Sequence, residues 1–300
     1  MSWHAAEVIV DTTGKRLLFS TVRIANLTTS GIATTGTAFH LTVPLDDGGF
    51  SPLLVTNKHV VANAAKLSAH FIARKADANE PDLGRGAEVT LGPADWIGHP
   101  DPEVDVAVVP IAHVVQQYGH LLYAEPLPFS LLSTEIANHY VDAIEEITFI
   151  GYPNGHYDEK HLTPFVRRGI TATPMELDFS GKPTFLVDGS VFGGSSGSPV
   201  FLFNEGSYRG ANNSLVVGSR LRLVGIIAAT LLRNAQLPVE VANAEHVKIA
   251  QELNLGLAFN ARAIKETVES ALASAGLRLA ASAVPGGTSD SVPAPATPTS

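Results

Sequence analysis

Serines flanked by glycines, in the second half of the chain, are the residues best suited to chemistry. The stretch reads Gly193-Gly-Ser-Ser-Gly-Ser-Pro199. Glycines let the backbone make a tight turn and let a substrate carbonyl approach a hydroxyl without meeting a Cβ. A serine hydroxyl is a weak nucleophile at neutral pH, so it needs an adjacent base, typically a histidine oriented by a carboxylate. The stretch therefore predicts acyl transfer, with Ser195 or Ser196 as the nucleophile.

Ser195 is the nucleophile in one interpretation. Residues 193–197 fit the G-x-S-x-G turn of esterases and lipases. That turn joins a strand to a helix, and its acid and histidine follow later in the chain. Here Pro199 and a Val-Phe-Leu-Phe strand pattern follow directly, and His246 is the only later histidine. The surrounding sequence therefore disfavours this interpretation.

Ser196 is the nucleophile in the other interpretation, which rests on a resemblance. Gly194-Ser-Ser-Gly-Ser-Pro199 resembles the G-x-S-G-[GS]-P motif of the chymotrypsin-like (trypsin-fold) serine peptidases. The Ser-Pro ending is similar to the bacterial glutamyl-endopeptidase-like and HtrA-like branches. The family's triad runs in the order His, Asp, Ser along the chain. Thr35-Gly-Thr-Ala-Phe-His also resembles the strand that precedes the family's histidine segment.

The resemblance assigns the two partners of Ser196. Leu53-Leu-Val-Thr-Asn-Lys-His59-Val-Val-Ala looks like the family's histidine segment, an apolar strand followed by a short helical turn. Glu103-Val-Asp105-Val-Ala-Val-Val looks like its aspartate segment. Taken alone, a histidine at a strand end or an aspartate before a strand is an ordinary structural residue. Asp95 and Asp101 are rivals of Asp105, but neither leads directly into the apolar run.

The resemblance also implies an oxyanion hole and a substrate pocket. The hole would use the backbone N–H groups of Gly194 and Ser196. Ser190, six residues before the nucleophile, would lie near the bottom of the S1 pocket, which Ile227, Ala228 and Ala229 would help to line. Ser190 carries no charge to attract Arg or Lys, and no histidine stands near Ile227 as in glutamyl endopeptidases. We therefore expect a small or medium apolar P1 residue.

Ser195 stands where trypsin itself has an aspartate. In trypsin that aspartate pairs with a freed N-terminal amine during zymogen activation. Ser195 carries no charge, so we expect activity without cleavage to a new N-terminus. The alternative function is a binding or scaffold protein with the peptidase fold and no turnover.

Many short β-branched runs must position these residues, and Gly, Pro, Asn and Asp separate them. Examples are Leu17–Ile24, Thr37–Val43, Val104–Ile111, Val200–Phe203 and Leu221–Thr230. Apolar residues recur at the helical period over Ala261–Ala275 and more weakly over Ala112–Gly119. The resemblance implies an all-β fold of two six-stranded antiparallel barrels with a C-terminal helix. Residues 1–125 would form the first barrel with His59 and Asp105, residues 126–279 the second, and 280–300 a disordered tail.

Composition bounds the remaining function classes. The chain has 300 residues, no cysteine, a formal charge of -9 and 16% charged residues. These values exclude disulfides, thiolate chemistry and cysteine-ligated metals. With no basic cluster, phosphate loop, histidine ligand spacing or long apolar run, we expect no cofactor, metal, nucleic acid or membrane partner. The first residues show no signal-peptide pattern, which favours a cytoplasmic location; a secreted protein whose signal had been removed would have the same sequence. A polypeptide is the expected substrate, and a regulator could bind at an insertion over residues 231–255 or at the tail.

Overall fold

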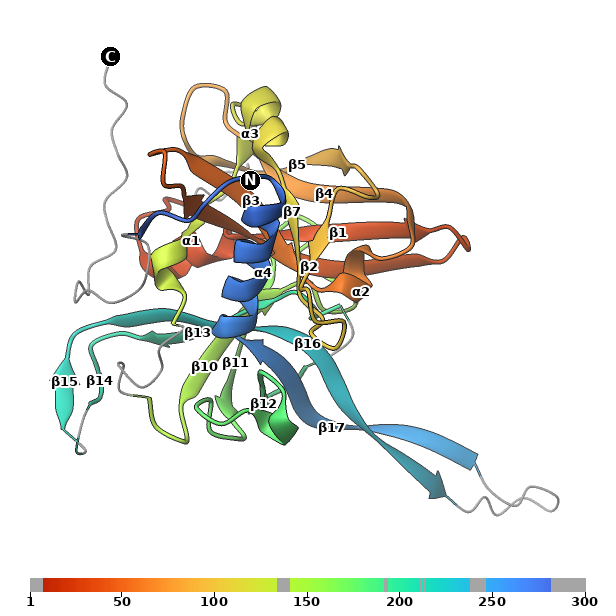
Figure 1. Ribbon diagram of the computed structural model, residues 1–300, viewed down its shortest axis with the longest axis vertical. Coiled ribbons are helices and arrows are strands. Elements are labelled where there is room, and N and C mark those ends of the chain that lie inside the picture. Colours follow the sequence, from red (N-terminus) through yellow and green to blue (C-terminus); the bar gives the residue numbers. More distant parts are fainter. Residues whose placement is uncertain are drawn as a thin grey trace, which may run out of the picture.

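Two β-sheet units follow one another along the chain, and the last helix packs across both (Figure 1). The computed structural model describes residues 8–133, 141–191, 194–210, 212, 214–237 and 247–281, with only the backbone course for residues 230–237 and 247–253. Strands dominate the described residues. The predicted all-β class with a C-terminal helix is thus confirmed.

The first unit is a nine-stranded sheet ordered β5-β4-β1-β2-β3-β7-β6, with β8 beside β4 and β9 parallel to β2. Its elements are α1 (Thr13–Leu18), β1 (Thr21–Thr28), β2 (Ala33–Pro44), β3 (Phe50–Thr56), α2 (Lys58–Val61), β4 (Ala64–Arg74), β5 (Pro81–Leu91), β6 (Ile97–Gly98), β7 (Ala107–Pro110), α3 (Ala112–Tyr118), β8 (Leu122–Tyr123), β9 (Leu127–Pro128) and the 3-10 helix η1 (Phe129–Leu131). Three of these strands, β6, β8 and β9, are only two residues long. The other six match the number expected for the first barrel.

The second unit is a closed six-stranded barrel, ordered β10-β11-β12-β17-β16-β13, with antiparallel neighbours throughout. Its elements are β10 (Glu146–Gly151), η3 (Pro153–Gly155), β11 (Phe165–Thr171), η4 (Phe179–Gly181), β12 (Thr184–Asp188), β13 (Pro199–Asn204), β16 (Arg220–Leu237), β17 (Val247–Asn260) and α4 (Ala261–Ser274), with a separate hairpin of β14 (Ser207–Arg209) and β15 (Leu215–Val217). The predicted antiparallel barrel is therefore confirmed.

Strands β16 and β17 run on beyond the barrel as a long two-stranded arm (Figure 1). Their pairing continues from Gly225↔Asn260 out to Leu237↔Val247. The insertion expected over residues 231–255 is thus an extension of a barrel hairpin. Its tip, residues 238–246, lies outside the described residues.

The central strands are buried on both faces because three apolar clusters meet around them. In β2, Phe39 and Leu41 join a cluster between the two units, whereas Ala38 joins the core of the first sheet. The polar residues Thr37 and His40 of β2 are buried as well, so this strand is enclosed on both faces although its sequence alternates. The cluster between the units takes Phe39, Leu41 and Val55 from the first sheet, Ile150, Phe201 and Ile226 from the barrel, and Ile264, Val268 and Leu272 from α4.

The predicted helices are confirmed, and one predicted strand is partly wrong. Helix α4 begins where the Asn260 side chain accepts the Ala263 N–H at 3.2 Å, which satisfies one of the donors left free at a helix start. Leu17 was predicted to start a strand but lies in α1, which the Thr12 hydroxyl caps by accepting the Lys15 N–H at 3.3 Å. Burial of Leu17 in the cluster between the units decides the local structure.

The chain after α4 returns to the first unit. Leu279 forms a bridge with Leu45, and the Ala280 N–H donates to the Pro44 carbonyl at 3.0 Å. Most of the predicted tail, residues 282–300, lies outside the described residues. In the described part of the chain, no helix has the length and apolar character needed to cross a membrane.

Candidate active site

His59 and Asp105 form a hydrogen-bonded pair. His59 lies in α2, and Asp105 lies in the loop that leads into β7. Asp105 Oδ2 lies 2.5 Å from His59 Nδ1, and Asp105 Oδ1 accepts the His59 backbone N–H at 3.0 Å. A carboxylate can only accept, so the shared proton belongs to Nδ1, and Nε2 keeps its lone pair. The pair thus holds the imidazole in the tautomer that a general base requires.

Residues around α2 fix the histidine from the first sheet. Val60 and Val61 are buried, and a Cβ on Gly36 of β2 would lie 2.6 Å from a Val60 methyl group. The sequence therefore needs glycine at position 36 for α2 to pack this closely. Just before the helix, Asn57 Nδ2 donates to the Asp105 backbone carbonyl at 2.6 Å. The two segments that carry the pair are thus tied to each other directly.

The loop that carries Asp105 is also held by helix α4. His99 is buried, and its Nδ1 accepts the Asp101 N–H at 3.0 Å. Its Nε2 therefore carries the proton, which it donates to Glu266 of α4 at 3.0 Å. A side chain of the C-terminal helix, remote in sequence, thus fixes this loop. Sequence analysis missed His99 and Glu266 because nothing in the local pattern of either residue indicates the other.

Asp101, a rival of Asp105, has a different role. Its Oδ1 accepts the Glu103 N–H at 2.9 Å, and its carbonyl accepts Lys58 Nζ at 2.8 Å. Burial lowers the pKa of Lys58, and the nearby carboxylates of Asp105 and Asp101 oppose that shift. Asp101 therefore shapes the turn, while Asp105 is the carboxylate that reaches the histidine.

The two candidate serines differ in exposure, and the turn that holds them leads into a strand. Ser195 is buried at 2% exposure, whereas Ser196 is partly exposed. The Ser198 N–H donates to the Ser195 carbonyl at 3.0 Å, which closes a tight turn, and strand β13 begins directly at Pro199. A strand after the turn is incompatible with the esterase elbow, which requires a helix. Of the two hydroxyls, the geometry leaves Ser196 the more accessible to a substrate.

Ser196 Oγ donates to the backbone carbonyl of Ala228 at 3.0 Å, its one hydrogen bond in the described part of the chain. Ala228 is the residue at which the pairing of β16 with β17 shifts register, between Ile227 and Ala229. Such irregularities free a backbone group from the ladder and often lie beside active sites. Among the described residues, Ser196 Oγ makes no hydrogen bond to the His59 ring, whose printed partner is Asp105.

Thr37 of β2, in the first unit, is hydrogen-bonded to the turn that carries the two serines, residues 194–198 (the serine turn). Its N–H donates to the Ser196 carbonyl at 2.9 Å, and its hydroxyl donates to the Gly194 carbonyl at 3.2 Å. The same hydroxyl accepts the Tyr152 N–H at 3.0 Å. Thr37 is fully buried, so these bonds replace water for its own N–H and hydroxyl, while Gly194 and Ser196 are only partly buried. Nothing in the sequence around Thr37 indicates this role, because its partners lie more than a hundred residues further along the chain.

Two glycines make the close approach of the serine turn feasible. Gly197 has φ of +89°, and a Cβ there would lie 1.7 Å from the Thr37 carbonyl oxygen. Gly194 has φ of +77°, and a Cβ there would lie 2.5 Å from the Asn154 backbone nitrogen. Glycine is the residue that tolerates both the positive φ and the lack of space. Within the described residues, neither the Gly194 N–H nor the Ser196 N–H donates to a protein acceptor.

The residues expected to line the substrate pocket lie in different surroundings. The Ile227 side chain is fully buried in the barrel core, and its carbonyl accepts the Gly197 N–H at 2.8 Å. Ala228 is buried and Ala229 is exposed. Ser190 is exposed just after β12, and its carbonyl accepts a hydrogen bond from Arg167 of β11.

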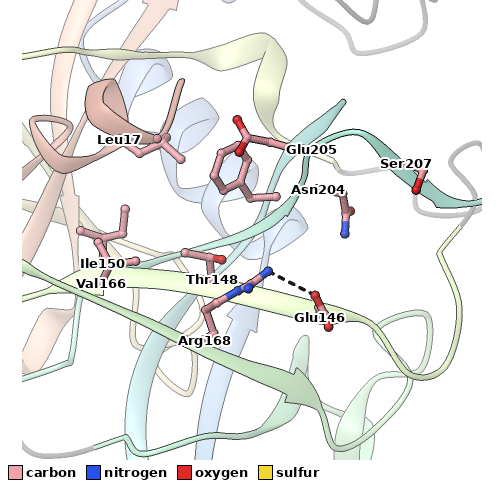
Figure 2. A pocket seen from close by; sticks show the side chains of 11 residues that line it. Leu17, Glu146, Thr148, Ile150, Val166, Arg168, Asn204, Glu205 and Ser207 are labelled. Atoms are coloured by element: carbon pink, nitrogen blue, oxygen red, sulfur yellow. Dashed lines mark hydrogen bonds and ion pairs between the residues drawn. The ribbon is translucent and has the colours of Figure 1, made fainter. Parts of the chain in front are cut away.

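A cavity of about 480 Å³ lies elsewhere, between α1 and the outer face of the barrel. Figure 2 shows Leu17 on one side of it and Thr148 and Arg168 on the other, with Arg168 paired to Glu146 at 3.2 Å. None of the predicted site residues lines it. Among the described residues, no group of three or more His, Asp or Glu side chains is placed to hold a metal ion.

Solved structures with distant sequences resemble the chain. The protease Rv3671c of M. tuberculosis, in its inactive form, is 16% identical with a TM-score of 0.45, over 90% of this chain and 96% of that one. The HtrA-type protease AlgW, crystallised with a tripeptide, is 16% identical with a TM-score of 0.47, over 87% of this chain and 62% of that one. No curated protein sequence matches the chain. The trypsin-like peptidase domain, however, matches residues 35–210, more than half of its 300 residues, and the chain therefore belongs to the trypsin-like family of serine-type peptidases.

Proposed function

We propose that the chain is a serine endopeptidase in which Ser196, His59 and Asp105 form the catalytic triad and a polypeptide is the substrate. The observation that carries the proposal is the two-bond contact between Asp105 and His59, which fixes the base in its reactive tautomer. Family membership supplies the reaction class, hydrolysis of a peptide bond. The partly exposed Ser196, in the turn clasped by Thr37, supplies the nucleophile.

The reaction begins with a rotation of the Ser196 side chain away from the Ala228 carbonyl. Its oxygen then attacks the substrate carbonyl carbon while His59 Nε2 accepts the hydroxyl proton. Asp105 stabilises the resulting imidazolium through its short contact with Nδ1. The tetrahedral intermediate collapses when His59 gives the proton to the leaving amine, and an acyl-Ser196 ester remains. Water, deprotonated by the same histidine, then releases the carboxylic acid and restores the serine hydroxyl.

The backbone N–H groups of Gly194 and Ser196 are proposed as the oxyanion hole. Both belong to the serine turn, and both lack a protein acceptor in the described part of the chain. Donors held in place before the reaction stabilise the developing negative charge without reorganising, and each typically contributes about a hundred- to a thousandfold in rate. The positive φ of Gly194 sets the direction of this backbone segment.

We also propose that the enzyme is active without cleavage to a new N-terminus. Ser195 is buried beside the nucleophile and has no negative charge to receive a freed amine. The chain of 300 residues should therefore react without any cut that creates a new N-terminus. A strict requirement for proteolytic trimming before any reaction would contradict this part of the proposal.

A fluorophosphonate probe, which reacts with activated serines, tests the proposal. We expect labelling of the unmodified chain, loss of labelling in Ser196→Ala, and retained labelling in the matched variant Ser195→Ala. Asp105→Asn should lower peptide hydrolysis by about ten-thousandfold, because the histidine then adopts the wrong tautomer. Loss of labelling only in Ser195→Ala would move the nucleophile. No labelling of any form of the chain would favour the silent scaffold.

A further inference from the structure

Arg167 of β11 lies on the inner face of the C-terminal barrel. In the pairing of β10 with β11, Arg167 stands opposite Phe149, whose side chain is in the barrel core. Directly opposed residues of an antiparallel pair share one face of the sheet. Its neighbour Arg168 stands opposite Thr148 on the other face, where it pairs with Glu146 beside the outer cavity (Figure 2). The side chains of the two adjacent arginines therefore lie on opposite faces of the barrel sheet, Arg167 inside and Arg168 outside.

The segment after β12 lies directly against Arg167. The ladder between β11 and β12 contains two pairs, Ile170↔Asp188 and Thr171↔Val187. A Cβ on Gly169 would lie 2.3 Å from the Asp188 carbonyl oxygen, so the two backbones are in close contact here. Beyond Asp188 the chain leaves the ladder, and the Arg167 guanidinium donates to the Ser190 carbonyl. A cationic side chain thus sits where the S1 pocket is proposed to end.

The charge at this position is retained. Burial lowers the pKa of Arg167, but an arginine side chain stays protonated in proteins. Asp188, the carboxylate closest to Ser190 in sequence, stands opposite the exposed Ile170 and lines an outer surface pocket with Arg168. It therefore lies on the face away from Arg167. Meanwhile Ile227, the largest apolar residue expected in the pocket, has its side chain in the barrel core.

We infer that Arg167 is a specificity-determining residue, which makes the enzyme prefer to cleave after an acidic side chain. The inference rests on the proposed function, in which Ser190 borders the S1 pocket. A guanidinium presents a planar fork of N–H donors that matches a carboxylate, and such charge-assisted bonds are about twice as strong as neutral ones. This replaces the apolar preference expected from the residue types of 227–229. We expect a Glu over Gln preference of about tenfold or more in kcat/KM.

Peptides that differ only at P1 test the inference. The set carries Glu, Asp, Gln, Asn, Ala or Leu at P1, so that Gln and Asn are neutral counterparts of the two acids. The enzymes compared are the unmodified chain, Arg167→Gln, Arg167→Lys and, as the matched control, Arg168→Gln. The Glu/Gln ratio should fall to about one in Arg167→Gln while cleavage after Ala and Leu stays within a few-fold. Arg168→Gln should keep the full ratio, and Arg167→Lys should keep part of it.

Several outcomes would overturn the inference. A Glu/Gln ratio near one in the unmodified chain would do so without any variant, which covers the case that Arg167→Gln does not fold. An equal loss on all peptides in Arg167→Gln, with an unchanged ratio, would indicate a structural role only. A chain that reacts with fluorophosphonate at Ser196 but cleaves no acidic peptide contradicts the inference alone. A chain that shows neither labelling nor cleavage contradicts the proposed function itself.

Discussion

Replacing Thr37 with valine would remove one hydroxyl that joins the two halves of the active site. Valine has nearly the same shape, so the change isolates hydrogen bonding from packing. In the structure the hydroxyl donates to the Gly194 carbonyl and accepts the Tyr152 N–H. Both partners would keep their positions and lose their bond. The serine turn would then be fixed to β2 only through the Thr37 backbone.

The expected loss follows from the burial of those partners. An unsatisfied buried donor or acceptor costs about 1–3 kcal/mol, and these two bonds leave two such groups, one of them only partly buried. The Ser198 hydroxyl, which donates to the Thr37 hydroxyl over a long 3.5 Å, would lose its bond as well. We therefore expect Thr37→Val to lower the free energy of unfolding by about 2–4 kcal/mol, against a typical total of about 5–15 kcal/mol. For a chain of this size the melting temperature should fall by roughly 3–7 °C.

Two measurements on Thr37→Val decide the matter, with Thr37→Ser as the matched control that keeps the hydroxyl. Urea denaturation gives the free energy of unfolding, and the rate of fluorophosphonate labelling reports the position of Ser196. Thr37→Ser should lose about 1 kcal/mol for the missing methyl group and label at nearly the normal rate. If Thr37→Val is as stable as Thr37→Ser and labels equally fast, the hydrogen bonds of the Thr37 hydroxyl have no energetic role and the reasoning fails.

Three further predictions concern pH, a distant contact and a glycine. Burial lowers the pKa of His40 to about 4, below its ordinary 6.5. Between pH 6.5 and 4 the unfolded chain therefore binds a proton that the folded chain does not. The free energy of unfolding, measured by urea denaturation, should fall by about 3 kcal/mol over this range. In His40→Leu this pH dependence should disappear. Glu266→Leu removes the acceptor of His99 and should lower kcat several-fold and the free energy of unfolding by about 1–2 kcal/mol. Glu266→Gln keeps an acceptor, so its kcat and stability should stay near those of the unmodified chain. Equal values for the two variants would refute the role of this contact. Gly197→Ala should abolish labelling, because its Cβ would meet a backbone oxygen at 1.7 Å. Gly48 has a similar φ of +85° but open space around it. Gly48→Ala should therefore lower the free energy of unfolding by only about 1 kcal/mol and label normally.

The pair of His59 and Asp105 and the turn that carries Ser196 could be predicted from the sequence. His59 and Asp105 were predicted from the resemblance of their segments to those of the family, and the structure places the two side chains in contact. The six-stranded barrel and the helix at the C-terminus were predicted equally well. These features succeed because each depends on a local pattern, such as an apolar run or a glycine turn.

Features that depend on two distant segments could not be predicted in this way. Leu17 has the residue type of a strand, yet its burial between the two units and the Thr12 cap place it in a helix. Ile227 has the residue type of a pocket wall, yet its side chain lies in the barrel core. Arg167 lies 23 residues before Ser190, and only the pairing of β10, β11 and β12 brings them together. A side chain's direction follows from strand register, which one sequence does not specify.

The absence of cysteine has a physical consequence for the proposed site, because His59 and Ser196 belong to different units. With no disulfide available, the relative position of His59 and Ser196 depends on packing and hydrogen bonds across the junction. Phe39 continues the strand of Thr37 into the apolar cluster that joins both units to α4. Separating the units would expose that cluster and also break the hydrogen bonds between Thr37 and the serine turn. Apolar burial and hydrogen bonding therefore both oppose separation of the units. The same strand thus contributes to the apolar cluster and holds the turn that carries the proposed nucleophile, so substitutions in β2 should change stability and labelling in parallel.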